Sequence, residues 1–165
     1  MANGKTGGSY DRYHTGAIRR IRFFVVLALL AAALFVFVFG VAVVHDDDMA
    51  PAYRAGRPVF YLRLGAPGRG DVAVLDVDVR GTVLRRVVGV PGDTVDLHGG
   101  IVYVNGLAER GSYSITRTDA VPDGAVYPLI LREGEYFVLG DRRETALDSR
   151  FFGLVTTDNI LGRLP

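Results

Sequence analysis

The residues best suited to chemistry are three consecutive aspartates, Asp46 to Asp48, which follow a long apolar run. Carboxylates can bind a metal ion, transfer protons or act as nucleophiles. Three consecutive side chains cannot all face one ion without a special loop, so we expect no metal site here. The simplest interpretation is a solvated acidic cap on the end of the apolar run.

Composition excludes several other chemistries. The chain of 165 residues has no cysteine, which rules out disulfides and thiolate sites. Its three histidines, His14, His45 and His98, are dispersed, so a histidine metal cluster is not expected. A net charge of +1 gives no sign of a nucleic-acid partner. We therefore expect no cofactor, no metal and no nucleic acid.

The apolar run, residues 23–44, contains no charged residue. As a helix it would span about 33 Å, enough to cross a bilayer. Arg19, Arg20 and Arg22 precede it and the aspartates follow it. The positive-inside rule then predicts a single-pass protein of the cell membrane, with a cytoplasmic N-terminus and an extracytoplasmic C-terminal domain. Residues 1–22 are expected to form a cytoplasmic, disordered, basic tail.

Two alternatives exist for this run. Gly40-Val41-Ala42 resembles a cleavage site, which would make the segment a signal peptide, but the run exceeds the usual 7–15 apolar residues of a signal-peptide core. A buried core helix is disfavoured because the run has no polar face.

Residues 45–165 are predicted to form an all-β domain. Short β-branched and aromatic runs alternate with turn signals, and no stretch keeps a helical period for three turns. Asn105-Gly106 is the strongest hairpin signal. The expected strands are 59–62, 72–75, 83–88, 101–104, 127–131 and 136–139. Their spacing is typical of a barrel or sandwich.

Four segments, in one order, resemble motifs of the bacterial type I signal peptidases, a family of membrane-anchored serine proteases with a Ser/Lys dyad. Asp48-Met49-Ala50-Pro51 resembles the family's Ser-Met-x-Pro, and Gly70-Asp71-Val72 its Gly-Asp-Val. The other two segments are Arg85-Arg86-Val87-Val88-Gly89-Val90-Pro91-Gly92-Asp93 and Gly140-Asp141-Arg142-Arg143, the latter continuing to Asp148-Ser149-Arg150 and Gly153. The resemblance implies a signal-peptidase-like β-barrel or sandwich domain following one transmembrane helix.

The differences from the family fall at its catalytic positions. The resemblance places Asp48 at the nucleophilic serine and Arg85 at the general-base lysine. It places Asp46 at the oxyanion donor and Ala146 at the serine that orients the lysine. Arginine stays protonated up to about pH 12 and cannot accept a proton, and an aspartate offers the oxyanion no hydrogen. Catalytic activity is therefore not expected.

The positions that match the family are ones that we assign to turns, strand ends and ion pairs. They are Met49, Pro51, Arg86, Gly89, Pro91, Gly92, Asp93, Gly140, Asp141, Asp148, Ser149 and Arg150. We expect Asp48 and Arg85 to form an ion pair that lowers the pKa of the aspartate. An aspartic-protease-like pair of Asp48 and Asp148 is disfavoured, because the arginine would keep Asp48 ionised and Asp148 is better explained as a partner of Arg150.

The resemblance thus implies a non-catalytic accessory or chaperone, of a pilus-assembly type, that binds an exported protein or pilin segment. The segment would lie near residues 44–48 and 82–85, where the aspartates should disfavour acidic peptides. The alternative is an active signal peptidase I, an endopeptidase that removes signal peptides from secreted preproteins. An inert remnant is a third possibility, which the intact structural motifs disfavour.

Overall fold

A computed structural model describes residues 10–77, 81–109 and 117–165, with side chains in the first helix from residue 17 onward. The chain divides into two compact units, Met1–Val38 and Phe39–Pro165. We describe each unit by itself.

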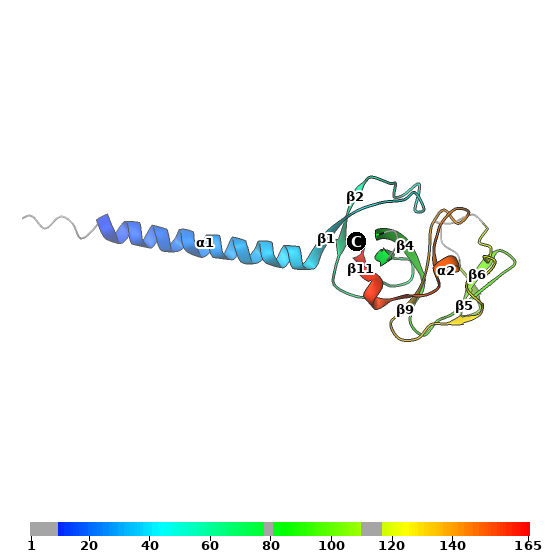
Figure 1. Ribbon diagram of the computed structural model, residues 1–165. Coiled ribbons are helices and arrows are strands. Elements are labelled where there is room, and N and C mark those ends of the chain that lie inside the picture. The colour runs from blue at the N-terminus through cyan, green and yellow to red at the C-terminus, as the bar shows by residue number, and fades with distance from the viewer. Residues whose placement is uncertain (1–9, 78–80, 110–116) are drawn as a thin grey trace, which may run out of the picture. The chain divides into compact units, whose positions relative to one another are not determined.

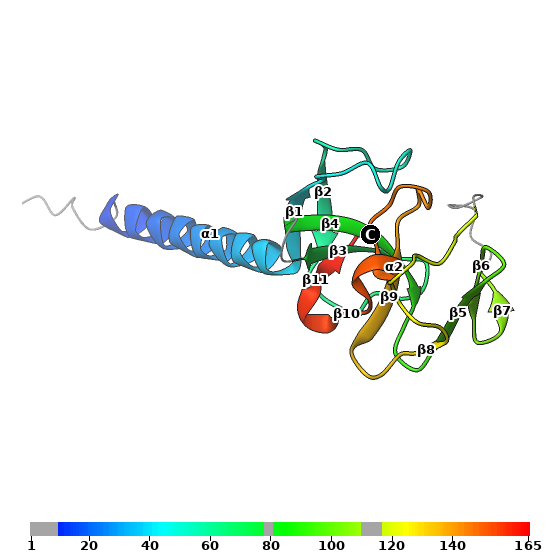
Figure 2. The same ribbon diagram turned by 45° about the vertical axis from the view of Figure 1, so that its right-hand side comes forward.

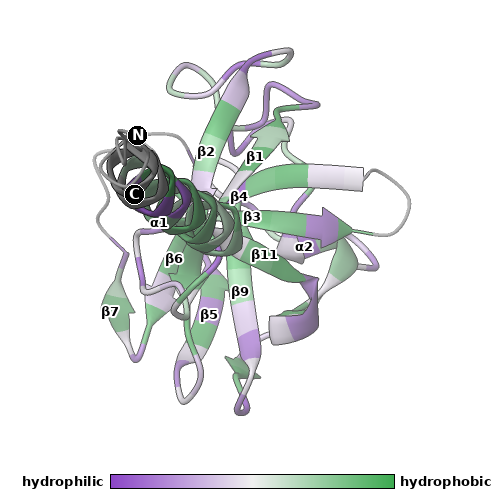
Figure 3. Ribbon diagram, turned by 90° about the vertical axis from the view of Figure 1, so that its left-hand side faces the viewer, coloured by the Kyte–Doolittle hydropathy of each residue, from purple (hydrophilic) through white to green (hydrophobic). Residues whose placement is uncertain are grey.

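The first unit contains one helix, α1 (Tyr10–Val38), whose segment Ala17–Val38 is long and apolar enough to cross a membrane. Figure 3 shows the hydrophobic colouring along this segment. The predicted bounds, 23–44, are wrong at both ends. Residues 10–22, expected to be disordered, are helical; four of them are arginines, which have a high helix propensity. Residues 1–9 of the expected tail lie outside the described part.

The second unit is mostly β-sheet, which confirms the predicted fold class. Its strands are β1 (Phe39–Val43), β2 (Pro58–Leu62), β3 (Val72–Val77), β4 (Gly81–Gly89), β5 (Thr94–His98), β6 (Ile101–Val104), β7 (Leu107–Ala108), β8 (Leu129–Ile130), β9 (Glu135–Leu139), β10 (Val155–Thr156) and β11 (Ile160–Arg163). A short helix, α2 (Ser149–Phe152), and a 3-10 turn, Thr157–Asn159, lie near the C-terminus.

The strands form two sheets. Within the described residues, one sheet has the order β1-β2-β11-β3-β4-β9-β10 and the other β7-β6-β5-β8. In both Figure 1 and Figure 2 the β5–β6 hairpin lies at the opposite end of this unit from β1 and β2. Strands β3 and β4 are central in the larger sheet and pair antiparallel from Val72↔Arg86 to Val77↔Gly81.

Strand β1 corrects the predicted end of the apolar helix. Its residues pair with β2 in the register Phe39↔Leu62 to Val43↔Pro58, and they alternate between exposed and buried positions. Gly40 lies under the ring of Tyr61, where a side chain would overlap the ring. Cleavage after Ala42 would therefore cut a strand that is paired within the sheet.

Three clusters of buried apolar side chains stabilise the unit. The first joins β1, β2, β3 and β4 and contains Val44, Met49 and Tyr61. The second fills the space around β5 and β6, and the third packs on Ala73, Leu75 and Val138. Since Met49 is fully buried in the first cluster, the acidic segment beside it is attached to the core.

Most predicted strands are present. The predicted strand 127–131 is shorter than expected and covers only Leu129–Ile130. Strands β1, β5, β7, β10 and β11 were not predicted. The Asn105-Gly106 hairpin is confirmed: both residues have positive φ, 54° and 78°, and they connect β6 to β7.

Candidate functional site

The segment that carries the aspartates is a compact loop after β1. Val44 and Met49 are buried in the core, and the backbone N–H of Gly56 donates to the carbonyl of Val44 (2.8 Å). The N–H groups of Ala50 and Tyr53 donate to the carbonyls of Asp47 (2.9 Å) and Met49 (3.0 Å). These bonds make the loop compact, and the burial of Val44 and Met49 attaches it to the core.

Arg85 lies at the centre of the site, in β4, and is only 1% exposed. Its Nε donates to the carbonyl of Leu147 (2.8 Å), and its Nη1 donates to the carbonyl of Leu84 (2.6 Å). Nη2 donates to Asp48 Oδ2 (2.6 Å) and Asp46 Oδ2 (2.9 Å), and Nη1 also reaches Asp46 Oδ1 (3.3 Å). The guanidinium is thus held by four different residues.

The predicted ion pair between Asp48 and Arg85 is confirmed. The structure adds a second carboxylate, Asp46, which was expected only as a missing oxyanion donor. It adds Leu147 as well, whose carbonyl accepts from Arg85 and whose N–H donates to Asp48 Oδ2 (3.1 Å). The aspartate spacing i, i+2 is compatible with two carboxylates on one cation, but nothing in the sequence indicates Leu147.

The expected pKa shift of Asp48 is wrong in direction. Burial of the carboxyl group raises its pKa above the ordinary aspartate value, and the neighbouring Asp46 raises it further. Arg85 and the N–H of Leu147 lower it, but they do not outweigh the burial. The side chain of Asp48 is 13% exposed, so the cost of removing its charge from water dominates the attraction to arginine.

The third aspartate, Asp47, does not join this cluster. Its Oδ1 accepts from the backbone N–H of Ala55 (3.0 Å). Two aspartates of the run therefore bond to Arg85 and the third to the backbone. In the part of the chain that the structure describes, no group of three metal-ligating side chains converges.

Asp148 is a structural residue, as predicted. It is fully buried, and its Oδ1 accepts from the N–H and Nε of Arg150 at 3.1 and 2.8 Å. Its Oδ2 accepts from the N–H of Gly140 (3.1 Å) and from Nη2 of Arg150 (2.9 Å). Asp48 and Asp148 are thus each bonded to a different arginine, which does not favour a shared proton between them. Ser149 Oγ accepts from the N–H of Val138 (3.0 Å).

Two further charged residues of the matched motifs also support the frame. Arg86 binds Asp141 through two parallel hydrogen bonds, both 2.7 Å, and donates to the carbonyl of Gly70. Asp93 Oδ2 accepts from the N–H of Val90 (2.9 Å) within the Pro91-Gly92 turn.

Close packing explains two of the matched glycines, Gly89 and Gly140, and involves Ala146. A Cβ on Gly140 would overlap the Ala146 methyl group and lie 2.9 Å from the carbonyl oxygen of Asp48. A Cβ on Gly89 would lie 2.7 Å from a methyl group of Val95. Ala146 itself is buried next to the Asp48 backbone, at the position where the resemblance places a serine.

Strand β9 pairs with β4 only from Arg86 onward, so the edge of β4 at residues 82–84 has no partner strand among the described residues. Side chains of the site occupy this edge instead. The backbone N–H of Val87 donates to the carbonyl of Asp71, on the β3 side of β4. Backbone groups alternate in direction along a strand, so the carbonyls of Thr82 and Leu84 point away from β3. The carbonyl of Thr82 contacts His45 Nδ1 (2.8 Å), and that of Leu84 accepts from Arg85 (2.6 Å). A peptide that paired with this edge would have to displace both contacts.

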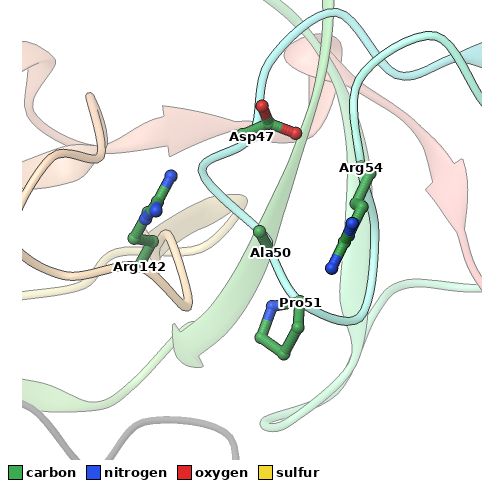
Figure 4. A pocket seen from close by; sticks show the side chains of 5 residues that line it. All are labelled: Asp47, Ala50, Pro51, Arg54 and Arg142. Atoms are coloured by element: carbon green, nitrogen blue, oxygen red, sulfur yellow. The ribbon is translucent and has the colours of Figure 1, made fainter.

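A pocket of about 450 Å³ opens beside the acidic loop (Figure 4). It is lined by Asp47, Ala50, Pro51, Arg54 and Arg142. Arg142 is attached to the site because its backbone N–H donates to the carbonyl of Asp48 (2.8 Å).

Comparison with known proteins identifies the family. The sequence model described as "Signal peptidase, peptidase S26" matches residues 17–165. A signal peptidase I of Bacillus licheniformis is 32% identical over 157 residues, covering 88% of this chain and 83% of that protein. A signal peptidase IB of Staphylococcus aureus is 29% identical over 163 residues, covering 84% and 85%.

The fold agrees with these matches. A crystal structure of a signal peptidase I from Enterococcus faecalis V583 superimposes with a TM-score of 0.51 at 29% identity, over 62% of this chain and 99% of that one. The family match spans both α1 and the β-sheet unit that carries the Arg85 cluster. The chain therefore belongs to the signal peptidase family, peptidase S26.

Proposed function

We propose that this family member is a non-catalytic, membrane-anchored accessory protein for exported or pilus proteins. One observation carries the proposal: the buried guanidinium of Arg85, bonded to Asp46, Asp48 and two carbonyls, fills the place where the family resemblance puts the dyad.

The chemistry of these groups supports the loss of peptide cleavage. A guanidinium retains its proton at every physiological pH, so Arg85 has no lone pair with which to activate a nucleophile. Asp48 Oδ2 accepts hydrogen bonds from both Arg85 and Leu147. These bonds lower the nucleophilicity of a carboxylate that is already a poor nucleophile for an amide. Asp46 would place negative charge beside a developing oxyanion.

The proposed location follows from the first unit. The apolar segment Ala17–Val38 has the length of a membrane span, and Arg19, Arg20 and Arg22 lie near its N-terminal end. The positive-inside rule then puts the N-terminus in the cytoplasm and the β-sheet unit on the outer face of the membrane. Exported segments would be encountered there.

The proposed partner is an extended segment of such a protein. Binding by backbone and pocket contacts needs no nucleophile, so peptide binding can persist in a protein that has lost catalytic activity. The Thr82 and Leu84 carbonyls already accept contacts from His45 and Arg85, so they are not open to the segment. The segment would instead bind at the pocket on the side of the loop that carries Asp47 and Pro51.

An active signal peptidase I is the second candidate. It is favoured by the names of the relatives, which are signal peptidases I and IB, and by the match over more than four fifths of their length. Such an enzyme would need a nucleophile and base other than a serine and a lysine at positions 48 and 85.

The test is a cleavage assay with the full chain in detergent and a signal-peptide substrate, with Asp48→Ala as the control. We expect no turnover from either protein. Turnover by the unmodified chain that Asp48→Ala abolishes would refute the proposal and support the active enzyme.

A restoration series tests the assignment of positions. Asp48→Ser with Arg85→Lys should remain inactive, because Asp46 and Ala146 still lack donors. Adding Asp46→Ser and Ala146→Ser should bring activity back. Activity of the double variant that the two further changes do not increase would contradict the roles assigned to Asp46 and Ala146.

A further inference from the structure

The pocket beside the acidic loop has cationic walls. Figure 4 shows Arg142 and Arg54 on opposite sides of Ala50, which shares its loop with Asp47 and Pro51. The side chains of both arginines are exposed to solvent. The lining thus combines two guanidinium groups with the apolar residues Ala50 and Pro51.

Neither guanidinium is bonded to another group among the described residues. In residues 10–77, 81–109 and 117–165, Arg54 and Arg142 form no side-chain hydrogen bond or ion pair, whereas the guanidinium groups of Arg85, Arg86 and Arg150 are all bonded. Their hydrogen-bond donors are therefore available to a ligand.

The acidic run does not cancel these charges. Asp46 and Asp48 bond to Arg85 and do not line the pocket, so of the three aspartates only Asp47 does. The pocket walls carry two positive charges and one negative charge. An anionic group is consequently the ligand that these walls favour.

The one negative residue discriminates among anions. Asp47 uses Oδ1 to accept from Ala55, so its Oδ2 can accept another donor. A phosphate group presents mostly acceptor oxygens and a higher negative charge than a carboxylate, so Asp47 repels it more strongly. A peptide with an acidic side chain presents a carboxylate for the arginines and backbone N–H groups for Asp47, so it matches the walls better.

We propose that this pocket binds an aspartate or glutamate side chain of an extended peptide segment, with Arg54 and Arg142 as the carboxylate-binding residues. The inference rests on the proposed function for the identity of the client, and it names the sequence feature by which a client is recognised. It also reverses the expectation that the aspartates make the site unfavourable for acidic peptides.

The experiment uses the full chain in detergent micelles and a pair of fluorescent, end-blocked peptides that differ only in one Asp or Asn. We expect the Asp peptide to bind more tightly, with the difference reduced at high salt. Arg54→Gln and Arg142→Gln should each weaken binding of the Asp peptide by about three- to fivefold and leave the Asn peptide unchanged. Arg132→Gln removes another exposed arginine, outside the pocket, and should change neither affinity.

A second measurement separates the pocket from the client. Succinate is titrated while the Nε–H resonances of Arg54 and Arg142 are followed by NMR. Succinate-dependent shifts of both resonances without binding of either peptide would support the anion pocket and refute the proposed client binding. Peptide binding with equal affinity for Asp and Asn, unaffected by both arginine variants, would overturn the pocket and leave the client proposal standing. Stronger shifts with inorganic phosphate than with succinate would also overturn it, because the site would then be one for phosphate groups.

Discussion

Replacing Arg85 by methionine tests whether the buried guanidinium stabilises the site. Methionine keeps a long unbranched chain but removes the charge and every donor. Two carboxylates, Asp46 and Asp48, would lose their common cation while remaining 19% and 13% exposed, respectively. The carbonyls of Leu84 and Leu147 would lose a donor as well.

The magnitude follows from these losses. Removing one partner of a buried ion pair costs about 3–5 kcal/mol, because the remaining charge is left uncompensated. We expect Arg85→Met to lower the free energy of unfolding of the β-sheet unit by that amount at neutral pH. In the triple variant Asp46→Asn, Asp48→Asn, Arg85→Met no charge remains, and the cost should fall to roughly 1–3 kcal/mol from the unsatisfied carbonyls.

The assay is urea unfolding of the full chain in detergent, followed by near-UV circular dichroism of tyrosine, since the chain has eight tyrosines and no tryptophan. Arg132→Met, at an exposed position, is the matched control and should change stability by less than about 0.5 kcal/mol. A loss below about 1 kcal/mol for Arg85→Met, or a triple variant less stable than the single one, would refute the reasoning.

Two further predictions concern the surroundings of the same site. Because the pKa of Asp48 is raised in the folded protein, its contribution to stability is greatest below the ordinary aspartate pKa and is lost as the pH rises through the raised value. Asp48→Asn should therefore gain stability relative to the unmodified protein as the pH of urea titrations rises from the ordinary aspartate pKa to neutrality, and a relative loss would mean that Arg85 outweighs burial. Gly140→Ala should cost about 1–3 kcal/mol in the same assay, because the added methyl group overlaps Ala146 and approaches the Asp48 carbonyl, whereas Gly56→Ala, with open space around its Cβ but a φ of 79°, should cost only about 1 kcal/mol; equal costs would contradict the packing explanation.

Local signals predicted much of the β-sheet unit. The Asn105-Gly106 turn requires positive φ at two successive residues, and few residue pairs allow that, so the sequence indicates the hairpin directly. The strand Thr94–His98 was missed although its residues alternate in burial, because three of the five, Thr94, Asp96 and His98, are polar. A polar alternation is a weak signal until its partner strand is known.

Boundaries set by distant pairing were not predictable. Nothing in the composition separates Phe39–Val43 from the apolar residues before it. It is a strand because Pro58–Leu62 supplies its hydrogen-bond partners. An apolar run gives the same hydropathy whether it is helix or strand, so the helix could not be ended correctly at Val38 from sequence alone.

The sequence by itself determined the residue types of the site: an arginine that cannot lose its proton, and aspartates where the family resemblance places the nucleophilic serine and the oxyanion donor, on a frame of matched turns and ion pairs. Only the tertiary structure decided how those charges are arranged. Arg85 meets Asp46, which is 39 positions away, and Leu147, which is 62 positions away. It also decided the direction of the pKa shift of Asp48, since burial depends on the packing of the whole unit, whereas the sequence suggested only the attraction to Arg85.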